Sequence, residues 1–353
     1  MKNKAWVFVV LGVFCSVITF ADGPLGHWQF PRNHGIHPSF NVEWWYLTGH
    51  ITDTDQKKHG VQVTFFRYKV QSVSGNRSLF NSDQLYVAHA AWTDINKKEF
   101  SHDERVGRPG LTKLIAEKRQ MNLQIQDWRL YQKGERFIID IPASFGHLKL
   151  DLVPAKAKIF HGKNGKSFKG PHPDQFSYYY SYTRLKGNAS LATAKKKIQS
   201  DQVSLWMDRE IFDQSVNDTQ QGWDWFAIQC DDNMELMCFQ VRGKTPETDF
   251  RAGTLVATNG ETVSLKMSDI SFTILDDWKS KKTGITYPLK WQIKIPKYGV
   301  DLIVDRTINN QELSVSTPLP MSYWEGSCRV TGTHAGNAYM ELVGYERYQK
   351  GAK

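Results

Sequence analysis

A two-residue alternation of apolar and polar side chains runs along most of this chain and restricts what it can fold into. Between positions 287 and 295 every odd-numbered residue is apolar, namely Tyr287, Leu289, Trp291, Ile293 and Ile295. Because successive side chains of a strand point to opposite faces, this pattern predicts a half-buried strand. Comparable runs cover residues 43–50, 61–70, 85–92, 121–128, 137–141, 148–153, 177–185, 203–210, 223–230, 234–242, 263–274, 300–308, 323–332 and 338–348. We therefore predict an all-β protein whose antiparallel sheets close into barrels or sandwiches.

The segments between these runs indicate two domains. Helical periodicity is scarce, and we expect one short helix, within residues 111–118. Residues 213–222 are polar and lack any periodicity, which is typical of a linker. The sequence thus predicts an N-terminal β domain over residues 22–214 and a C-terminal β domain over residues 215–353.

The first 21 residues have the composition of a secretory signal peptide. Lys2 and Lys4 precede an apolar run from residue 5 to residue 20, and Ala21 supplies a small residue at the expected cleavage position. The run is shorter than the roughly 20 residues that span a bilayer. We therefore expect cleavage after Ala21 and a periplasmic or secreted protein of a bacterium.

The net charge indicates which binding partners to expect, and the cysteine count indicates whether disulfides form. The net charge of +9 falls to +7 when Lys2 and Lys4 are removed with the signal peptide. The remaining lysines form short clusters between strands, so we expect no nucleic-acid partner, whereas contact with an anionic membrane surface stays open. Cys230, Cys238 and Cys328 remain after cleavage. Because an odd number of cysteines cannot form a complete set of disulfides, we expect buried free thiols.

The segment 43–50 places a carboxylate beside three consecutive aromatic residues. In a strand, Glu43 and Trp45 share one face, whereas Tyr46 and His50 share the other. Aromatic rings with a few polar tips are typical of a pocket for an apolar ligand. All four residues are therefore candidate ligand-binding residues. Most buried glutamates beside Tyr or Trp, however, are structural and cap a sheet edge or pair with an arginine, and this alternative applies to Glu43 and to Glu341.

The segment 204–210 is the second candidate, because Trp206, Asp208 and Glu210 share one face of a predicted strand. Carboxylates two residues apart on a strand lie roughly 7 Å from each other. Beside an indole ring, one carboxyl group can be desolvated and keep its proton while its neighbour stays ionised. This division suits acid–base chemistry, with Asp208 and Glu210 as candidate catalytic residues and Trp206 as a ligand-binding residue. The alternative is a pair of surface carboxylates tied to Arg209 or to a lysine.

Four more residues complete the candidate ligand-binding set. Glu341 and Tyr345 share one face of the last predicted strand. Trp225 lies in the Trp-rich segment 223–226, which serves equally well as core or as pocket. His172 lies in a Gly-Pro-His-Pro-Asp loop, either at the mouth of a pocket or in a plain turn.

The sequence contains no complete metal or cofactor motif. His34 and His37 offer two metal ligands, but no third ligand follows at a helpful spacing. A phosphate-binding loop, a dinucleotide fingerprint and a nucleophile elbow are also missing. We therefore expect neither a metal nor a cofactor.

Together these segments resemble the carotenoid 1,2-hydratase family, which includes the AttH/CrtC-type proteins. The resemblance covers nearly the whole mature chain, through residues 30–35, 43–50, 177–185, 206–210, 222–226, 323–326 and 341–345. Its most specific motifs are Glu-Trp-Trp-Tyr at 43–46 and Gly-Trp-Asp-Trp-Phe at 222–226. The resemblance implies two lipocalin-like antiparallel β domains in tandem, a barrel followed by a barrel or sandwich, with an apolar site in or between them.

The resemblance also implies an activity, the cofactor-free addition of water to an alkene. Asp208 would then be the acid, Glu210 its partner or base, and Trp45, Trp206 and Trp225 the apolar wall. The expected ligand is an apolar small molecule, such as a terpenoid, a polyene or a lipid.

One motif departs from the family pattern, because the hydratases carry Asp-His-x-Trp where this sequence has Asp-Arg-Glu-Ile at 208–211. Only the first of these positions matches. Two further functions stay open, a non-catalytic carrier of lipids or other apolar molecules and an accessory protein of an envelope transport system.

Overall fold

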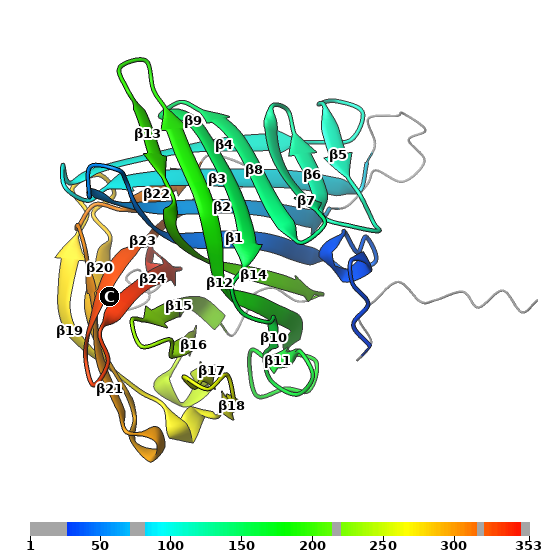
Figure 1. The fold of residues 1–353 in the computed structure, drawn as a ribbon. Helices are drawn as coiled ribbons and strands as arrows, with labels where there is room; N and C mark the ends of the chain where they lie inside the picture. Colours follow the sequence, from blue (N-terminus) through cyan, green and yellow to red (C-terminus); the bar gives the residue numbers. More distant parts are fainter. Residues whose placement is uncertain (1–26, 71–81, 214–219, 316–320, 347–353) are drawn as a thin grey trace, which may run out of the picture.

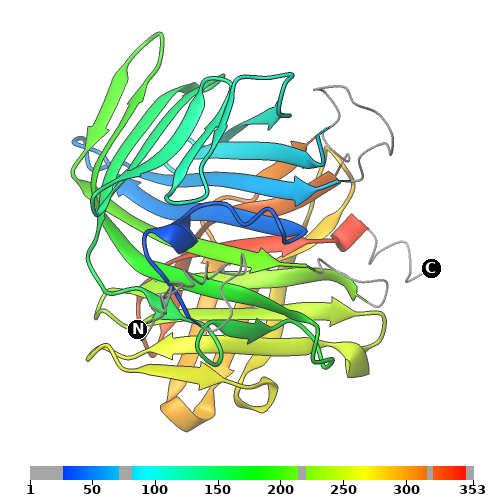
Figure 2. The same cartoon turned by 90° about the vertical axis from the view of Figure 1, so that its right-hand side faces the viewer.

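Two curled antiparallel sheets build the protein (Figures 1 and 2). The computed structural model describes residues 27–70, 82–213, 220–315 and 321–346, so the predicted signal peptide lies outside the described residues. The first sheet is a nearly closed barrel and the second is a half-barrel, as expected of tandem lipocalin-like domains. The prediction of an all-β fold is confirmed.

The first sheet forms the N-terminal barrel. Its strands are β1 (Val42–Thr52), β2 (Lys58–Lys69), β3 (Gln84–Asp94), β4 (Glu99–Gly107), β5 (Leu114–Ala116), β6 (Asn122–Ile125), β7 (Trp128–Lys133), β8 (Arg136–Ala143), β9 (Gly146–Pro154), β10 (Ile159–Phe160), β11 (Lys166–Phe168), β12 (Phe176–Ala192), β13 (Lys197–Ser200) and β14 (Gln202–Phe212). They pair in the order β4-β3-β2-β1-β14-β12-β9-β8-β7-β6-β5, with β10, β11 and β13 attached to β12.

Polar side chains join the two ends of this first sheet. Arg105 Nε of β4 donates to Asp127 Oδ1 at 3.1 Å, and Gln126 Nε2 donates to the Val106 carbonyl oxygen at 3.1 Å. Both hydrogen bonds link β4 to the turn between β6 and β7. The sheet therefore curls almost into a closed barrel.

The second sheet forms the C-terminal half-barrel. Its strands are β15 (Gln220–Cys230), β16 (Glu235–Gly243), β17 (Phe250–Val256), β18 (Thr262–Leu265), β19 (Ser271–Lys279), β20 (Thr286–Ile295), β21 (Val300–Arg306), β22 (Glu312–Val315), β23 (Met321–Gly332) and β24 (Gly336–Val343). They pair in the order β18-β17-β16-β15-β24-β23-β21-β20-β19, with β22 beside β23. Short 3-10 turns complete the fold, namely η1 (Arg32–His34), η2 (Pro246–Thr248), η3 (Met267–Asp269) and η4 (Pro296–Tyr298).

Two local predictions are wrong. Residues 111–118 form no helix, because the backbone of Leu114–Ala116 pairs with β6 and becomes β5. The predicted strand 263–274 is interrupted by η3, which separates β18 from β19. These two strands lie at opposite ends of the second sheet, so the chain between them must change direction.

Each sheet packs around its own apolar core, and a further apolar cluster lies between the sheets. Trp45 and Leu47 of β1 join the core of the barrel, whereas Tyr46 joins the cluster between the sheets. In β14, Leu205 lies on the barrel side and Trp206 lies between the sheets. The predicted alternation of these two strands is confirmed, and it gives each strand one face toward the second sheet.

Gly60 of β2 lies against β23 and β24 of the second sheet. A Cβ atom at this position would be 2.8 Å from the Ser327 Cβ of β23 and 3.1 Å from the Tyr339 hydroxyl of β24. A side chain at this position would therefore crowd Ser327 and Tyr339 of the second sheet.

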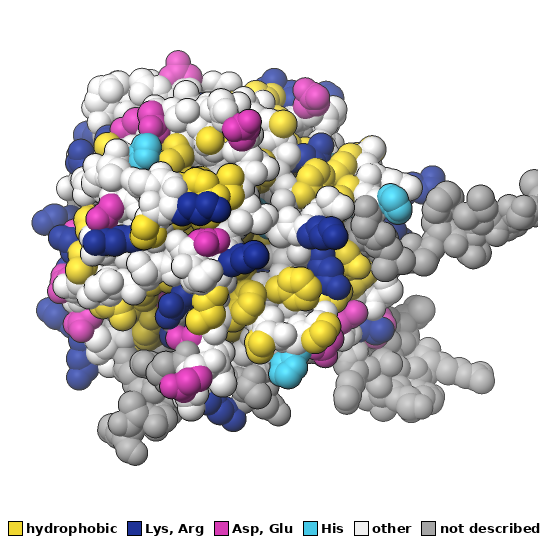
Figure 3. Space-filling view, turned by 90° about the horizontal axis from the view of Figure 1, so that it is seen from below, with side chains coloured by type: hydrophobic (Ala, Val, Ile, Leu, Met, Phe, Trp, Pro, Cys, Tyr) yellow, Lys and Arg dark blue, Asp and Glu magenta, His cyan; other side chains and the backbone are white. Residues whose placement is uncertain are grey.

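The described residues also show the state of the cysteines and whether they contain a membrane-spanning helix or a metal site. Cys230, Cys238 and Cys328 are buried free thiols, as predicted. In the same part of the chain, no helix has the length and apolar character needed to cross a bilayer, and no group of three His, Cys, Asp or Glu side chains is arranged to hold a metal ion. The face seen from below carries hydrophobic and basic side chains side by side (Figure 3).

Candidate functional site

The candidate site lies between the two sheets, where β1, β12 and β14 of the barrel face β15, β23 and β24 of the half-barrel (Figure 1). Strand register sets its order: Asp208 lies opposite Tyr46 on one side and Ser181 on the other. In the second sheet, Glu341 lies between Trp225 and Glu325. We name this set the inter-sheet layer; its members are Tyr46, Tyr179, Ser181, Trp206, Asp208, Glu210, Trp223, Trp225, Glu325, Tyr339 and Glu341.

Asp208 is a buried carboxyl group that contacts only uncharged donors among the interactions described for it. The Trp206 indole donates to Oδ1 at 2.6 Å, the Tyr179 hydroxyl donates to Oδ2 at 2.6 Å, and the Ser181 hydroxyl donates to Oδ1. Burial raises the pKa of Asp208 to about 7, against the opposing effect of these hydrogen bonds. The side chain therefore exchanges a proton near neutral pH, as a general acid must.

Glu210 lies two residues further along β14 and has a cationic partner. Lys169 Nζ lies 2.9 Å from Glu210 Oε2, and the Ser177 hydroxyl donates to the same oxygen at 2.5 Å. The Lys169 ammonium group also lies over the Tyr179 ring, 4.5 Å from its centroid. The negative charge of Glu210 is one of the causes that raise the pKa of Asp208.

Glu325 and Glu341 form a second pair of carboxyl groups, directly opposite each other on β23 and β24. Burial raises the pKa of Glu325 well above its usual range, and the charge of Glu341 raises it further. The Trp223 indole donates to Glu341 Oε2 at 2.9 Å, while burial raises the pKa of Glu341 to about 7. Because two neighbouring carboxylates repel each other, this pair holds at least one proton at neutral pH.

Aromatic rings fill the space between the two groups of carboxyls. The Trp225 indole donates to the Tyr179 hydroxyl at 3.1 Å, and its ring meets Tyr46 edge to face with centroids 5.1 Å apart. The faces of such rings attract positive charge, by about 2 kcal/mol when the pair is desolvated. The layer therefore combines a protonated acid with surfaces that can stabilise a cation.

The inter-sheet layer reaches the surface at one end. There the aromatic side chains and a carboxyl group are only half-buried: Trp44, Phe66, Tyr68, Trp223 and Glu341. The rings of Trp44 and Phe66 lie 6.2 Å apart, and those of Phe66 and Tyr68 lie 6.0 Å apart and stacked. This ring-lined end of the inter-sheet layer is therefore the part of the layer that reaches the surface.

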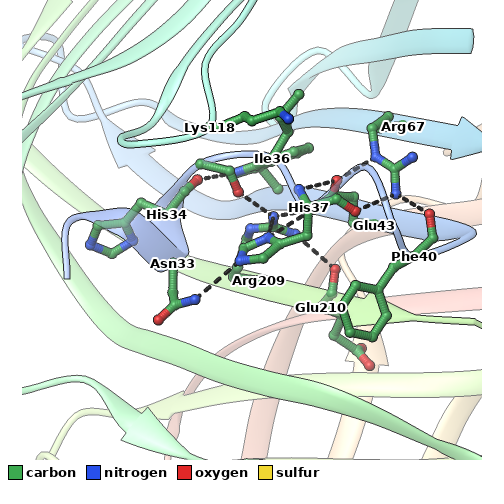
Figure 4. Close-up of polar contacts among 12 residues, drawn as sticks. Asn33, His34, Ile36, His37, Phe40, Glu43, Arg67, Lys118, Arg209 and Glu210 are labelled. Atoms are coloured by element: carbon green, nitrogen blue, oxygen red, sulfur yellow. Dashed lines mark hydrogen bonds and ion pairs between the residues drawn. The ribbon is translucent and has the colours of Figure 1, made fainter. Parts of the chain in front are cut away.

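Glu43 lies on the opposite face of β1, in a buried ionic cluster (Figure 4). Its carboxylate binds the guanidinium groups of Arg67 and Arg209 and accepts the backbone N–H of His37 at 2.8 Å. Burial opposes ionisation, but Arg209, His37 and Arg67 outweigh it and lower the pKa of Glu43. The Arg209 guanidinium covers the Trp45 ring, 3.8 Å from its centroid. Glu43 and Trp45 thus pack the η1 segment onto the barrel, outside the inter-sheet layer.

The remaining predicted ligand-binding residues occupy three different places. His50 Nε2 lies 2.8 Å from the Ser327 hydroxyl of the second sheet, and desolvation lowers its pKa to about 4. His172 is exposed in the turn before β12. Tyr345 donates to Asp224 at 2.9 Å in the core of the half-barrel, because β24 ends at Val343 and Gly344 has a left-handed φ of 85°. That turn ends the alternation that would have placed Tyr345 beside Glu341.

The structure therefore brings part of the predicted set together. Tyr46, Trp206, Asp208, Glu210, Trp225 and Glu341 share the inter-sheet layer, with His50 at its edge. Glu43, Trp45, His172 and Tyr345 lie elsewhere, for the reasons given above.

Sequence reasoning missed four polar side chains of this region. Tyr179 and Ser181 belong to a strand in which alternate residues face Asp208, and this pattern alone could have found them. Glu325 alternates with Tyr323 and Ser327 in the same way. His161 lies just after β10, a two-residue strand defined by its pairing with β12, so the local sequence does not state that it meets Ser181.

Comparison with known proteins agrees with this architecture. A model of the family described as AttH-like matches residues 23–345. The crystal structure of an AttH protein from Nitrosomonas europaea is 30% identical in sequence with a TM-score of 0.80, over 92% of this chain and 99% of that chain. Among curated proteins, no sequence matches this chain.

Two more distant structures share the fold. Kievitone hydratase from Nectria haematococca has a TM-score of 0.70 at 16% identity, over 90% of this chain and 94% of that chain. The crystal structure of CghA has a TM-score of 0.53 at 9% identity, over 89% of this chain and 92% of that chain. At these identities the likeness concerns the fold alone.

Proposed function

This chain belongs to the AttH-like family, and from that premise we propose that it is a hydratase or isomerase that protonates an alkene without a cofactor. The expected substrate is an apolar terpenoid or polyene. One observation carries the proposal: Asp208 has a pKa of about 7 in a layer of aromatic rings between the two sheets. A carboxyl group in that condition can act as a general acid at neutral pH.

In the proposed reaction, protonated Asp208 donates its proton to the less substituted alkene carbon, and the π bond supplies the electron pair. The positive charge that forms on the neighbouring carbon is stabilised by the faces of Tyr46, Trp206 and Trp225. In hydration, a water molecule attacks this carbon and loses a proton to Glu210 or to Glu341. In isomerisation, the same base instead removes a proton from the adjacent carbon.

The hydrogen bonds of Asp208 fit both of its protonation states. When the carboxyl group is ionised, Tyr179, Ser181 and Trp206 all donate to it. When it is protonated, either hydroxyl can rotate and accept its proton, whereas the indole cannot. Trp225 then remains a donor to the Tyr179 oxygen. The site can thus release and regain a proton without rearranging its side chains.

A carrier of apolar molecules is the second candidate function, because the protein also contains a cleft of about 930 Å³. The cleft lies between the 156–164 segment of the barrel and the β17–β18 hairpin, and Trp28, Phe30 and Phe160 are among its lining residues. A carrier needs such a cavity but needs no acid. For either function, the signal-like composition of residues 1–21 supports a location outside the cytoplasm.

The test is turnover by the purified protein with a panel of terpenoid and polyene alkenes, in ¹⁸O-labelled water for hydration and in D₂O for isomerisation. We expect Asp208→Asn to lower isotope incorporation by about 10²-fold or more. Glu312→Gln is the matched control, because Glu312 is equally buried and accepts from three hydroxyls but lies outside the inter-sheet layer. It should keep full turnover.

Two outcomes would contradict the proposal. Equal isotope incorporation by Asp208→Asn and the unaltered protein would exclude Asp208 as the acid. No incorporation by either protein, together with an apolar molecule retained by both in native mass spectrometry, would establish a carrier instead.

A further inference from the structure

We propose that Ser181, His161 and Thr254 form a proton relay between Asp208 and the cleft beside the β17–β18 hairpin. The relay would restore the proton of Asp208 after turnover through the protein, and the proton would not have to come from solvent inside the inter-sheet layer. It deepens the proposed function and rests on it, because a relay is needed only where Asp208 gives up a proton.

Three consecutive hydrogen bonds make up the relay. Ser181 of β12 donates to Asp208 Oδ1. His161 Nε2 lies 2.6 Å from the Ser181 hydroxyl, and His161 Nδ1 lies 2.9 Å from the Thr254 hydroxyl of β17. The four residues come from four separate segments, and three of them belong to the barrel while Thr254 belongs to the half-barrel. The chain of contacts therefore exists only when the two sheets are docked.

The outer end of the relay lies at the cleft. Thr254 and the neighbouring Thr183 both line this cleft of about 930 Å³, together with Val256, Gly162 and Ser264. All four residues are buried, and of the four it is Thr254 that lines the cleft, so the relay meets the cleft at Thr254. This route leaves Asp208 through β12 and β17, away from the ring-lined end of the layer.

The donors and acceptors are consistent along the whole relay. With Asp208 ionised, Thr254 O–H donates to His161 Nδ1, His161 Nε2–H donates to Ser181 Oγ, and Ser181 O–H donates to Asp208. Each proton then moves one bond inward, and Thr254 takes a new proton from water in the cleft. The net result is one proton transferred from the cleft to Asp208, while the proton that Glu210 or Glu341 took up in the reaction leaves to solvent. His161 is left in its other tautomer and must return to the first tautomer before the next transfer.

The imidazole stays uncharged throughout this transfer. Burial lowers the pKa of His161 well below its usual value, and the nearby Lys169 ammonium group lowers it further. Its ring packs against Tyr179, with centroids 4.0 Å apart. Because neither nitrogen faces a carboxylate directly, His161 transfers protons by exchanging tautomers through two hydroxyls.

A purely structural role for His161, as a link between the sheets, predicts different results. A link affects how stable the protein is, whereas a relay affects how fast Asp208 gains a proton. The test must therefore measure a rate that does not depend on any substrate.

The experiment is a pH jump from a photolysed caged proton, followed by time-resolved infrared spectroscopy of the purified protein. The C=O band of protonated Asp208 is identified by its loss in Asp208→Asn. We expect Thr254→Val to slow the appearance of this band by about tenfold or more, with an unchanged equilibrium midpoint. Thr254→Ser should restore the rate, because it restores the hydroxyl.

Thr183→Val is the matched control, because Thr183 lines the same cleft and its hydroxyl is unpaired in the described structure. It should leave the rate unchanged. His161→Gln keeps two hydrogen-bonding atoms but cannot exchange tautomers, so it should slow the band as Thr254→Val does. If His161→Gln fails to fold, the rate in Thr254→Val alone tests the relay, because this variant leaves the hydrogen bond between His161 and Ser181 in place.

Equal rates in the unaltered protein and in Thr254→Val would overturn the relay, as would an equal slowing in Thr183→Val. These results are independent of the turnover assay. A protein without turnover but with slowed protonation in Thr254→Val would refute the proposed function and retain the relay. Loss of turnover in Asp208→Asn, together with an unaltered protonation rate in Thr254→Val, would support the proposed function and refute the relay.

Discussion

Glu43 and Asp208 are buried carboxyl groups on neighbouring strands, and they differ in their partners. Glu43 binds two arginines on the barrel side of β1, so its charge is fully compensated. Asp208 faces the other way and contacts two hydroxyls and an indole. Burial disfavours the charge of both groups, but only Glu43 has cations that outweigh it. The comparison teaches that burial alone does not make a proton donor; burial without a cationic partner does.

The largest expected effect comes from removing the compensated carboxylate. Glu43→Gln would leave Arg67 and Arg209 buried without a counter-charge, so we expect a loss of about 3–5 kcal/mol in the free energy of unfolding. Asp208→Asn replaces a group that is already largely uncharged below its pKa, and should cost about 1 kcal/mol or less. Urea unfolding at mildly acidic pH measures both. Similar losses in the two variants would contradict the distinction.

The next largest effect concerns Glu210. It is intermediate between Glu43, which has two buried arginine partners, and Asp208, which contacts no cation among the described residues, because its partner Lys169 is partly exposed. Lys169→Met would leave the Glu210 carboxylate buried beside Ser177 alone, and should lower the free energy of unfolding by about 1–3 kcal/mol. The double variant Lys169→Met/Glu210→Gln should recover part of this loss. A double-mutant cycle without any coupling would show that the ion pair contributes nothing.

The pH dependence of stability should separate the two kinds of carboxyl group. The pKa values of Asp208 and Glu341 rise from 3.8 and 4.5 to about 7 on folding. The folded state then binds more protons than the unfolded state between these values, so both groups lower stability as pH rises toward about 7. The variant Asp208→Asn/Glu341→Gln should therefore gain stability relative to the unaltered protein over this range, with no further gain above it.

Glu43 should behave in the opposite way, because its pKa is lowered on folding. Its contribution to stability is complete above the ordinary value of 4.5 and is lost as pH falls below it. Urea unfolding at a series of pH values measures all three groups. A relative stability of the Asp208→Asn/Glu341→Gln variant that does not change with pH would refute this assignment.

The smallest expected effect comes from a single donor to Asp208. The Tyr179 hydroxyl lowers the pKa of Asp208 by stabilising its charged form, so Tyr179→Phe should move the Asp208 titration to higher pH. Infrared titration of the carboxyl band measures the midpoint. Tyr182→Phe is the control on the same strand, because the Tyr182 ring lies in the barrel core. A downward shift in Tyr179→Phe, or an equal shift in both variants, would contradict the hydrogen-bond assignment.

The sequence predicts those parts of the candidate site that follow from the alternation of side chains along a strand. Period-two patterns place Trp206, Asp208 and Glu210 on one face, and the structure shows the same face. The sequence does not predict side-chain positions that depend on a turn or on the pairing of distant strands. Gly344 turns Tyr345 away from Glu341. No local pattern indicates that Arg67 and Arg209 meet Glu43. Such contacts depend on residues far apart in the chain.

The fold was predictable to a similar extent. The long strands with one apolar face were expected, whereas β4 was missed because Glu99–Gly107 is polar on both faces and lies at the edge of its sheet. The short strands β10 and β11 were missed because they are defined only by pairing with β12. The strand β17 (Phe250–Val256) was missed as well, although its Leu255 joins a core. Hydrophobic patterning thus predicts long strands with one apolar face and overlooks short strands and edge strands.

Gly60 has a consequence for how members of this family could diversify. A Cβ atom at this position would crowd Ser327 and Tyr339 of the second sheet, so most substitutions there would disturb the contact between the two halves of the molecule. Under the proposed function, adaptation to a bulkier or smaller substrate would therefore change rings such as Tyr46 and Trp225, while the backbone around them stays constant. Variation among relatives is therefore expected at the rings and not at position 60.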